Sequence, residues 1–485
     1  MLIRRAEIDG RSPFDVRIES DRVAAIEPTI DACPGENILD AAGGALLPGL
    51  HDHHIHLFAL AAAERSVQCG PPHVRSAAEL ARALAEGRAA SQGAEVSPFS
   101  DIALSGGVAR RAWLRGFGYH ESVAGDLDRS MLDSWVPDRP LRIQHRCGVA
   151  WFLNSAAIRT LRLDEGVDAD GVERGADARA TGRLFRCDAF LRAALGESEV
   201  PSLASVSTRL ARYGVTGVTD ATATNGPSEL EAFVRAVDRG DLIQRLHIMG
   251  NDDLPDTRHT HIRRAARKIV LDETALPSME ELTAIIRRTH ETQRSVAIHC
   301  VTRTELVLAC AALRETGSSV TDRIEHAAVA PTDALELLAN VRATVVTQPN
   351  FVLERGDEYL ADVDERDRVW LYRCAGLLER GIPVGGGTDA PYGDSNPWLA
   401  MQAAVSRTTR SGRRLGIEER VTPERALKLF TSDPAAPGGE VRAITVGAQA
   451  DLCLLDCSWS KARERLSSED VRATFRAGRC VWRRD

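Results

Sequence analysis

The chain lacks the segments by which proteins enter or cross a membrane. Residues 1–5 lead into no apolar signal-peptide core, and no uninterrupted apolar run approaches the roughly 20 residues of a membrane-spanning helix. A block of basic residues is also missing, since the net charge is -8 and arginines alternate with acidic residues. These absences disfavour membrane and nucleic-acid partners and are typical of a globular protein in aqueous solution.

Closely spaced cysteine pairs are missing as well. The 10 cysteines are scattered, none forms a C-x-x-C pair, and only Cys453 and Cys457 lie close together in the sequence. This spacing is more typical of reduced, mostly buried thiols in the cytosol than of a disulfide framework. We therefore expect a cytoplasmic protein.

Short apolar runs repeat along the chain and indicate the fold. A length of 485 residues exceeds one ordinary core and predicts a large barrel or several domains. Eight runs predict buried parallel strands: 45–50, 215–220, 245–249, 268–272, 295–300, 322–326, 343–347 and 383–388. Helical patterns separate most of them, which favours an α/β fold of the (β/α)8 TIM-barrel type. The alternative is a doubly wound open sheet, but no G-x-G-x-x-G motif follows the first strand.

Two of the expected helices have marked starts. Ser278 and Glu281 form a capping box, which predicts a helix from there to about Gln293. Thr422 caps another helix, with Pro423 at its first position. Both helices fit the alternation of strands and helices.

Both ends of the chain and one long insertion depart from the barrel pattern. Period-two apolar patterns near each terminus predict a small β-sandwich domain from residues 1–44 and 441–485, attached to a barrel at 45–440. Residues 58–203 separate the first two strands and are too many for a loop. Helical stretches at 77–90 and 153–161 and a strand at 141–145 predict an inserted subdomain, which we expect over the barrel mouth, where it would shape the substrate pocket.

A histidine-rich stretch follows the Pro48-Gly49 turn and carries His51, His53, His54 and His56. In an extended segment alternate side chains share a face, so His54 and His56 point the same way and can close on one metal ion. His51 and His53 face elsewhere. Imidazole is the commonest ligand for zinc and related ions. A surface histidine cluster is the alternative, disfavoured because the flanking residues read as a buried strand and a turn.

Further candidate ligands fall at other strand ends, where barrels of this type carry their catalytic groups. Lys268 opens the expected fourth strand, and His299 and His326 end the fifth and sixth. Asp389 follows the eighth strand after a run of three glycines, 385–387, which lets backbone segments approach closely. A lone histidine at a strand end is more commonly a hydrogen-bonded core residue, but the set as a whole favours a metal centre.

These motifs resemble the amidohydrolase superfamily, and more closely its amidohydrolase 3 branch, which includes N-substituted formamide deformylases. The resemblance rests on Pro-Gly-x-x-Asp-x-His-x-His at 48–56, Thr-Asp-Ala-Pro at 388–391 and Gly-Ala-Gln-Ala-Asp-Leu at 447–452. The sequence Gln-His-Arg at 144–146, followed by Asn-Ser-Ala at 154–156, is more specific to the branch. The similarity covers nearly the whole chain. His51, His53 and a short connection between the third and fourth strands depart from the family pattern.

The resemblance implies a metal-dependent hydrolase with one or two divalent ions, zinc first among them. Its expected ligands are His54, His56, Lys268, His299, His326 and Asp389. Lys268 would bridge two metals as a carbamate, because an ammonium would repel a cation; an ordinary salt bridge is its alternative role. Asp389 would also transfer protons, with His299 and His326 as further catalytic residues.

The expected reaction is hydrolysis of a non-peptide carbon–nitrogen bond in a small amide-type molecule by metal-activated water. A metal-dependent lyase or isomerase on the same scaffold and an inactive, metal-free binding protein are the alternatives. Candidate substrate-binding residues are Trp113, Tyr119, His120, Glu121, His145, Arg146, Gln348 and Asn350. Each could instead be structural, and Arg146 could hold a carboxylate in bidentate fashion. The oligomeric state is open, with a homodimer as one candidate.

Overall fold

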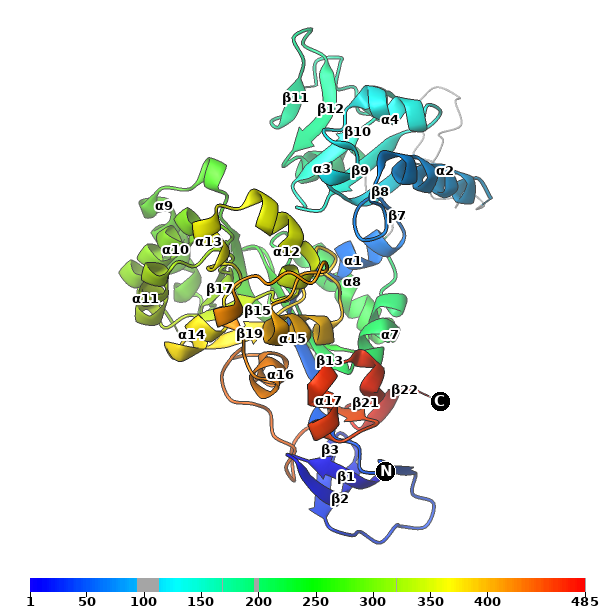
Figure 1. Cartoon of the computed structure of the whole chain (residues 1–485), viewed down its shortest axis with the longest axis vertical. Coiled ribbons are helices and arrows are strands. Elements are labelled where there is room, and N and C mark those ends of the chain that lie inside the picture. Colours follow the sequence, from blue (N-terminus) through cyan, green and yellow to red (C-terminus); the bar gives the residue numbers. More distant parts are fainter. Residues whose placement is uncertain (94–112, 168, 196–199, 320, 485) are drawn as a thin grey trace. The chain divides into compact units, whose positions relative to one another are not determined.

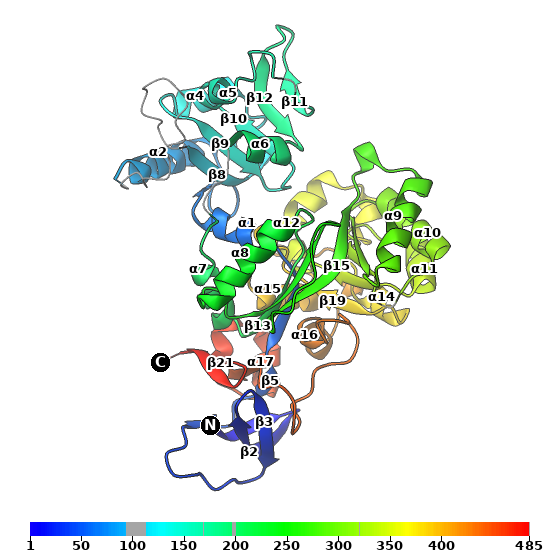
Figure 2. The same cartoon turned by 180° about the vertical axis from the view of Figure 1, so that it is seen from behind.

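The computed structural model describes residues 1–93, 113–167, 169–195, 200–319 and 321–484 (Figures 1 and 2). The chain divides into two compact units. The first combines Met1–Leu57 with Ser202–Asp485, and the second is Phe58–Pro201. The second unit begins where the insertion is predicted to begin and ends two residues earlier.

A parallel eight-stranded sheet forms the centre of the first unit. Its strands follow chain order: β6 (Leu50–Ile55), β13 (Val215–Asp220), β14 (Arg245–Gly250), β15 (Ile262–Val270), β16 (Val296–Cys300), β17 (Arg323–His326), β18 (Thr344–Thr347) and β19 (Val384–Gly386). Just beyond β19, the Asp389 amide donates to the His54 carbonyl at 2.8 Å, and the His56 amide donates to the Ala390 carbonyl at 2.9 Å. These bonds join the last strand to the first. The predicted TIM barrel is confirmed, and the open-sheet alternative is wrong.

Helices follow most of the barrel strands and begin where the sequence offers caps. They are α7 (Ala204–Arg212), α8 (Pro227–Asp238), α9 (Met279–Glu291), α10 (Arg303–Thr316), α11 (Thr332–Val341), α12 (Asn350–Asp362), α13 (Glu365–Arg368), α14 (Ala375–Glu379), α15 (Pro397–Ser406) and α16 (Pro423–Thr431). The Ser278 hydroxyl accepts from the Glu281 amide at the start of α9, and Thr422 caps α16 ahead of Pro423. Both predicted helix starts are confirmed. Residues 251–261, between β14 and β15, contain no helix, which agrees with the short connection predicted there.

Two predicted barrel strands need correction. The run 45–50 is divided: β5 (Leu46–Pro48) joins a terminal sheet, and the barrel strand β6 begins at Leu50. The fourth strand begins at Ile262, six residues before the predicted start. The sequence pattern missed this start because arginines interrupt the apolar run, so that only the last residues of the strand form a continuous apolar segment. Lys268 therefore lies near the carboxyl end of β15 and does not open it.

The two termini share one core. The first sheet has the order β3-β2-β1-β4, and the second the order β22-β21-β20-β5. The remaining elements of this region are β1 (Leu2–Ile8), β2 (Arg11–Glu19), β3 (Arg22–Glu27), β4 (Ile38–Asp40), β20 (Leu452–Leu455), α17 (Trp459–Arg465), β21 (Val471–Arg476) and β22 (Arg479–Arg483). Ile3 and Val16 pack with Leu454 and Phe475 in a single buried cluster. The β-rich terminal region thus consists of two four-stranded sheets whose side chains form a common apolar layer.

The second unit has its own six-stranded sheet, in the order β11-β12-β10-β9-β8-β7. Its strands are β7 (Val67–Gln68), β8 (Leu114–Tyr119), β9 (Leu141–His145), β10 (Ala150–Leu153), β11 (Val172–Arg174) and β12 (Ala180–Phe185). Its helices are α2 (Ala77–Gly93), α3 (Glu121–Ala124), α4 (Arg129–Trp135), α5 (Ser155–Leu161) and α6 (Asp188–Leu195), while α1 (Leu57–Glu64) begins at the unit boundary. Within the described residues, no helix is both long and apolar enough to span a membrane.

Candidate metal centre

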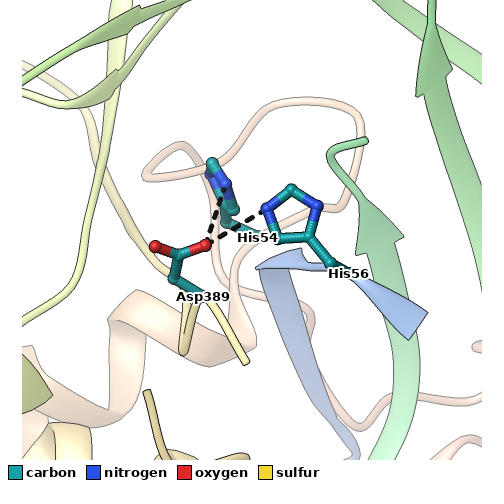
Figure 3. Close-up of side chains that lie close together, drawn as sticks. All are labelled: His54, His56 and Asp389. Carbon is teal, nitrogen blue, oxygen red and sulfur yellow. Dashed lines mark ion pairs between the residues drawn. The ribbon is translucent and has the colours of Figure 1, made fainter. Parts of the chain in front are cut away.

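Three side chains converge where the first and last barrel strands meet (Figure 3). His54 and His56 extend from the end of β6, and Asp389 follows β19. Oδ1 of Asp389 lies 3.5 Å from Nε2 of His54 and 3.2 Å from Nε2 of His56. One ligand atom from each residue falls within 4.8 Å of the others, a grouping that can hold a metal ion.

Other predicted ligands lie beside this group. The His326 ring centroid is 4.8 Å from that of His54 and 4.4 Å from that of His299. Nζ of Lys268 lies 4.0 Å from Oε2 of Glu325, which also contacts His54. The structure therefore gathers all the predicted ligands at the carboxyl ends of five barrel strands.

Backbone geometry around the centre is unusual at two of these residues. His326 has φ of 69° and Asp389 has φ of 56°, both in the left-handed region that non-glycine residues rarely adopt. Such conformations cost energy and cluster at functional sites, where they aim side chains. At Gly387 a Cβ atom would lie 2.5 Å from Cβ of His54, so only glycine permits this close approach.

Each of three imidazoles is oriented through its second ring nitrogen. Nδ1 of His54 lies 2.5 Å from Oε2 of Glu325, and Nδ1 of His56 lies 2.8 Å from Oγ1 of Thr222. His326 donates from Nδ1 to Oε1 of Gln348 at 2.8 Å. Nε2 of each ring is then the nitrogen available to the centre, the arrangement that metal-binding histidines adopt.

Two buried carboxylates in this arrangement were not predicted as site residues. Glu325, on β17, also accepts two hydrogen bonds from Arg323, at 2.7 and 3.1 Å. Asp52 accepts from the His54 amide and from both the amide and the hydroxyl of Thr388, and so fixes the end of β6 against the segment after β19. Burial raises the pKa of Asp52 to about 7. Its place in the Pro-Gly-x-x-Asp motif was the available signal.

Two buried nitrogens at the centre make no hydrogen bond with any described residue, and they test whether the site fits a cation. Nε2 of His326 and Nζ of Lys268 are buried, with no hydrogen-bond partner among the described residues. Buried polar atoms are rarely left in this state, so each is placed to receive a ligand. Burial lowers the pKa of His54, His299 and His326, which keeps the rings neutral and able to coordinate.

Asp389 contributes the negative charge. Burial alone would raise the pKa of its carboxyl group, but a hydrogen bond with His56 and the nearby His54 and His326 rings lower it well below the usual range. Neutral imidazole nitrogens and one ionised carboxylate are a donor set that suits a divalent ion such as zinc. The residues present therefore fit a metal.

His51 and His53 face away from this centre, as the strand alternation predicts. Nε2 of His51 lies 2.9 Å from Oγ1 of Thr219, and Nε2 of His53 lies 3.2 Å from Oγ of Ser432. Both rings are buried. They pack within the barrel and contact none of the candidate ligands through these atoms.

Gln348 and Asn350, both predicted to bind substrate, are fully buried. Gln348 contacts His326, as described above. The Asn350 amide donates to Glu354 at 3.1 Å and to the Thr388 carbonyl at 3.0 Å, while its Oδ1 is buried without a partner. These contacts place both residues beside the candidate ligands, and substrate binding by either residue stays a prediction.

The remaining predicted substrate residues gather in the second unit. His145 ends β9 and stacks on His120 at 5.9 Å between ring centroids, and its Nε2 lies 3.1 Å from Glu121. Tyr119 is buried, and its hydroxyl donates to the Gly125 carbonyl at 2.5 Å. The Arg146 amide donates to the Tyr119 carbonyl. Trp113 lies beneath the Arg142 guanidinium, 5.9 Å from the ring centroid. Their role in substrate binding stays a prediction.

The sequence matches one known protein family over most of its length, since the amidohydrolase family model aligns with residues 37–482. The chain belongs to the amidohydrolase family. This amidohydrolase is 25% identical to an N-substituted formamide deformylase of Arthrobacter pascens, over 89% of this chain and 88% of that protein. It is also 25% identical to a putative amidohydrolase of Bacillus subtilis (strain 168), over 81% of this chain and 80% of that protein.

A solved structure shares the fold. An uncharacterized metal-dependent hydrolase from Pyrococcus horikoshii OT3 superposes with a TM-score of 0.68 at 19% identity, over 94% of this chain and 97% of that one. This likeness concerns the fold alone. The family match is what makes the protein a metal-dependent hydrolase of carbon–nitrogen bonds other than peptide bonds. Hydrolysis is thereby favoured over the lyase or isomerase alternative and over a metal-free binding protein.

Proposed function

We propose that this amidohydrolase uses one or two zinc ions to release an amine from a small N-acyl or N-formyl compound. The observation that carries the proposal is a pair of buried nitrogens with no hydrogen bond among the described residues, Nε2 of His326 and Nζ of Lys268, beside the group of His54, His56 and Asp389. The substrate class is suggested by the relative that is named an N-substituted formamide deformylase. The imidazoles and Asp389 would hold the metal.

When bound, the ion would supply Lewis acidity, which acidifies water and polarises a carbonyl oxygen. The chain's own residues would do the rest. Asp389, ionised in the free protein, would accept a proton from water and return it to the departing amine nitrogen. The left-handed backbone at Asp389 and the buried contacts of His54 and His326 hold these groups in place before substrate arrives.

Lys268 would join the site as a carbamate. Burial lowers the pKa of its amine to about 8, although Glu325 opposes the shift. About a tenth of the amine is therefore uncharged at pH 7, a far larger share than for an ordinary lysine, and this form can add CO₂. An ammonium next to a divalent cation would be repelled, whereas a carbamate carries a negative charge and two oxygens.

All ten cysteines are free in the structure, which supports a reducing compartment. We therefore propose that the enzyme is cytoplasmic. Localisation of a tagged full-length chain would test this. The homodimer considered from the sequence stays a prediction, and light scattering of the purified protein would test it.

The function is tested by metal analysis of purified protein together with a screen of N-acyl, N-formyl and cyclic amides for amine release. We expect one or two equivalents of zinc and release of stoichiometric amine and carboxylate from at least one N-acyl or N-formyl compound. Protein stripped with a chelator should lose this activity and regain it with added zinc. Metal-free protein that retains full activity would overturn the metal role, and turnover of cyclic amides alone would overturn the substrate class.

A further inference from the structure

A cavity lies at the opposite end of the barrel from the metal centre, within the first unit. It has a volume of about 360 Å³ and is bounded by the amino ends of β6, β13, β14 and β15 and by the segment from α16 to β20. Its polar lining includes His51, Arg245, His247, Arg263 and Arg442. None of these residues contributes to the proposed reaction.

Positive charge in this cavity is poorly neutralised. The Arg442 guanidinium donates to two carbonyl oxygens, those of Gly49 and Ser432, and no carboxylate lies within 4.0 Å of it in the described part of the chain. Arg263 is exposed and makes no hydrogen bond or ion pair with any described residue. Arg245 donates to Oε1 of Gln449 at 2.5 Å, and the nearest carboxylate to it among the described residues is Asp451, at 3.7 Å. Three guanidinium groups therefore face two lining carboxylates, Asp433 and Asp451.

A buried histidine in the cavity wall also makes no hydrogen bond with any described residue. His247 is 6% exposed and lines the cavity, and its ring has no hydrogen-bond partner among the residues that the structure describes. Its neighbour is His51, whose ring centroid lies 5.5 Å away. Burial first, and then the charges of Arg263 and Arg323, lower the pKa of His247 to about 3, so the ring is neutral and can donate one hydrogen bond.

We infer that this cavity binds a small organic or inorganic oxyanion, a carboxylate or phosphate group, between Arg245, Arg263 and Arg442, with His247 as a neutral donor. Arginine recognises both groups through paired N–H donors, and charge-assisted bonds of this kind are stronger than neutral ones. Apolar walls from Pro48, Pro434 and Ile444 leave space for a short carbon chain.

The inference can be tested by titrating the purified full-length enzyme with inorganic phosphate and, separately, with butyrate, while following the thermal midpoint and the heat of binding. Sodium chloride at equal ionic strength is the reference. A ligand that binds only the native state raises the midpoint in a saturable way. We expect saturation with phosphate or with butyrate, and the more effective of the two identifies the source of the oxyanion.

Two matched variants separate this cavity from the metal centre, which could also bind anions. Arg263→Gln should raise the dissociation constant about tenfold, the loss of affinity expected when one charge-assisted hydrogen bond is removed. Arg264→Gln changes the next residue on β15, which contacts Leu254 and Asp256 and does not line the cavity, and should leave binding unchanged. Equal affinities in the two variants, or no saturable shift above that of chloride, would overturn the inference.

Discussion

His326 and Gln348 form a buried hydrogen bond of 2.8 Å between Nδ1 and Oε1. A carboxamide oxygen can only accept, so Nδ1 carries the hydrogen and Nε2 keeps its lone pair. That Nε2 atom is the one buried without a partner at the metal centre. Gln348 therefore selects the tautomer in which His326 can coordinate a cation.

Replacing Gln348 by leucine should remove this selection, because leucine has a comparable size but no acceptor oxygen. Metal affinity and kcat should fall by about 10–100-fold, the usual effect of losing a group that orients a ligand, with little change in KM. Gln348→Glu retains an acceptor oxygen and should retain most of the metal. Steady-state kinetics and metal titration would check this, and a rise in KM alone would support the substrate-binding role predicted from the sequence.

The sequence predicts those features that repeat at short range. Alternation along β6 separates His54 and His56 from His51 and His53, and the structure places them on different faces. Apolar runs also locate seven of the eight barrel strands to within a few residues at their carboxyl ends, because each buried strand has its own continuous pattern.

Long-range contacts leave no such pattern. Glu325 orients His54 across 271 residues, and nothing near either residue predicts the pairing. The start of β15 is hidden because Arg263, Arg264 and Arg267 break its apolar run, while part of that strand is exposed. The division of 45–50 between β5 and β6 is equally hidden, since both pieces are apolar and only their pairing partners differ.

Paired removal of two candidate ligands should deplete the metal. His54→Ala with His56→Ala removes two of the three side chains that meet within 4.8 Å, and we expect most of the bound metal to be lost. His259→Ala with His261→Ala has the same spacing but lies on the connection before β15, and should keep its metal. Elemental analysis after mild purification measures both, and full metal retention in the first variant contradicts the ligand assignment.

Asp389→Asn should keep the shape of the site but remove the proton acceptor. We expect kcat to fall by roughly 10²–10⁴-fold with a modest change in KM, as when an interaction made only in the transition state is lost. Asp394→Asn, an exposed carboxylate five residues later, is the control and should remain active. A near wild-type rate in Asp389→Asn would move the base to His299 or His326.

Ionisation of the Glu354 carboxyl group should make the free energy of unfolding depend on pH. Burial raises the pKa of its carboxyl group from the ordinary 4.5 to about 7, although the carboxylate accepts hydrogen bonds from the Asp394 backbone amide and the Asn350 side-chain amide. Between these values the folded chain holds a proton that the unfolded chain releases, so stability falls as pH rises from 4.5 to about 7.

Glu354→Gln should therefore reduce the slope of the denaturation midpoint against pH in this interval. Below pH 4.5 the variant and the wild type should have similar midpoints, since both carry a neutral group at this position. The exposed Glu336, replaced in the same way, should leave the slope unchanged. Chemical denaturation at a series of pH values measures this, and an unchanged slope in Glu354→Gln would show that the carboxyl group titrates normally.

Lys268→Ala should remove a bridging ligand. The Lys268 amine is buried, has no hydrogen-bond partner among the described residues and lies 4.0 Å from Glu325, so it is placed to carry CO₂ toward the centre. We expect the variant to lose the second metal equivalent and nearly all activity, with partial rescue by short carboxylic acids that occupy the vacated space. Bicarbonate during reconstitution should raise metal occupancy in the wild type but not in the variant.

Lys428→Ala, on α16, is the control and should respond as the wild type does. A high-resolution crystal structure showing a bare amine at Lys268, paired with Glu325 beside a single ion, would defeat the bridging role and leave a mononuclear site held by the histidines and Asp389.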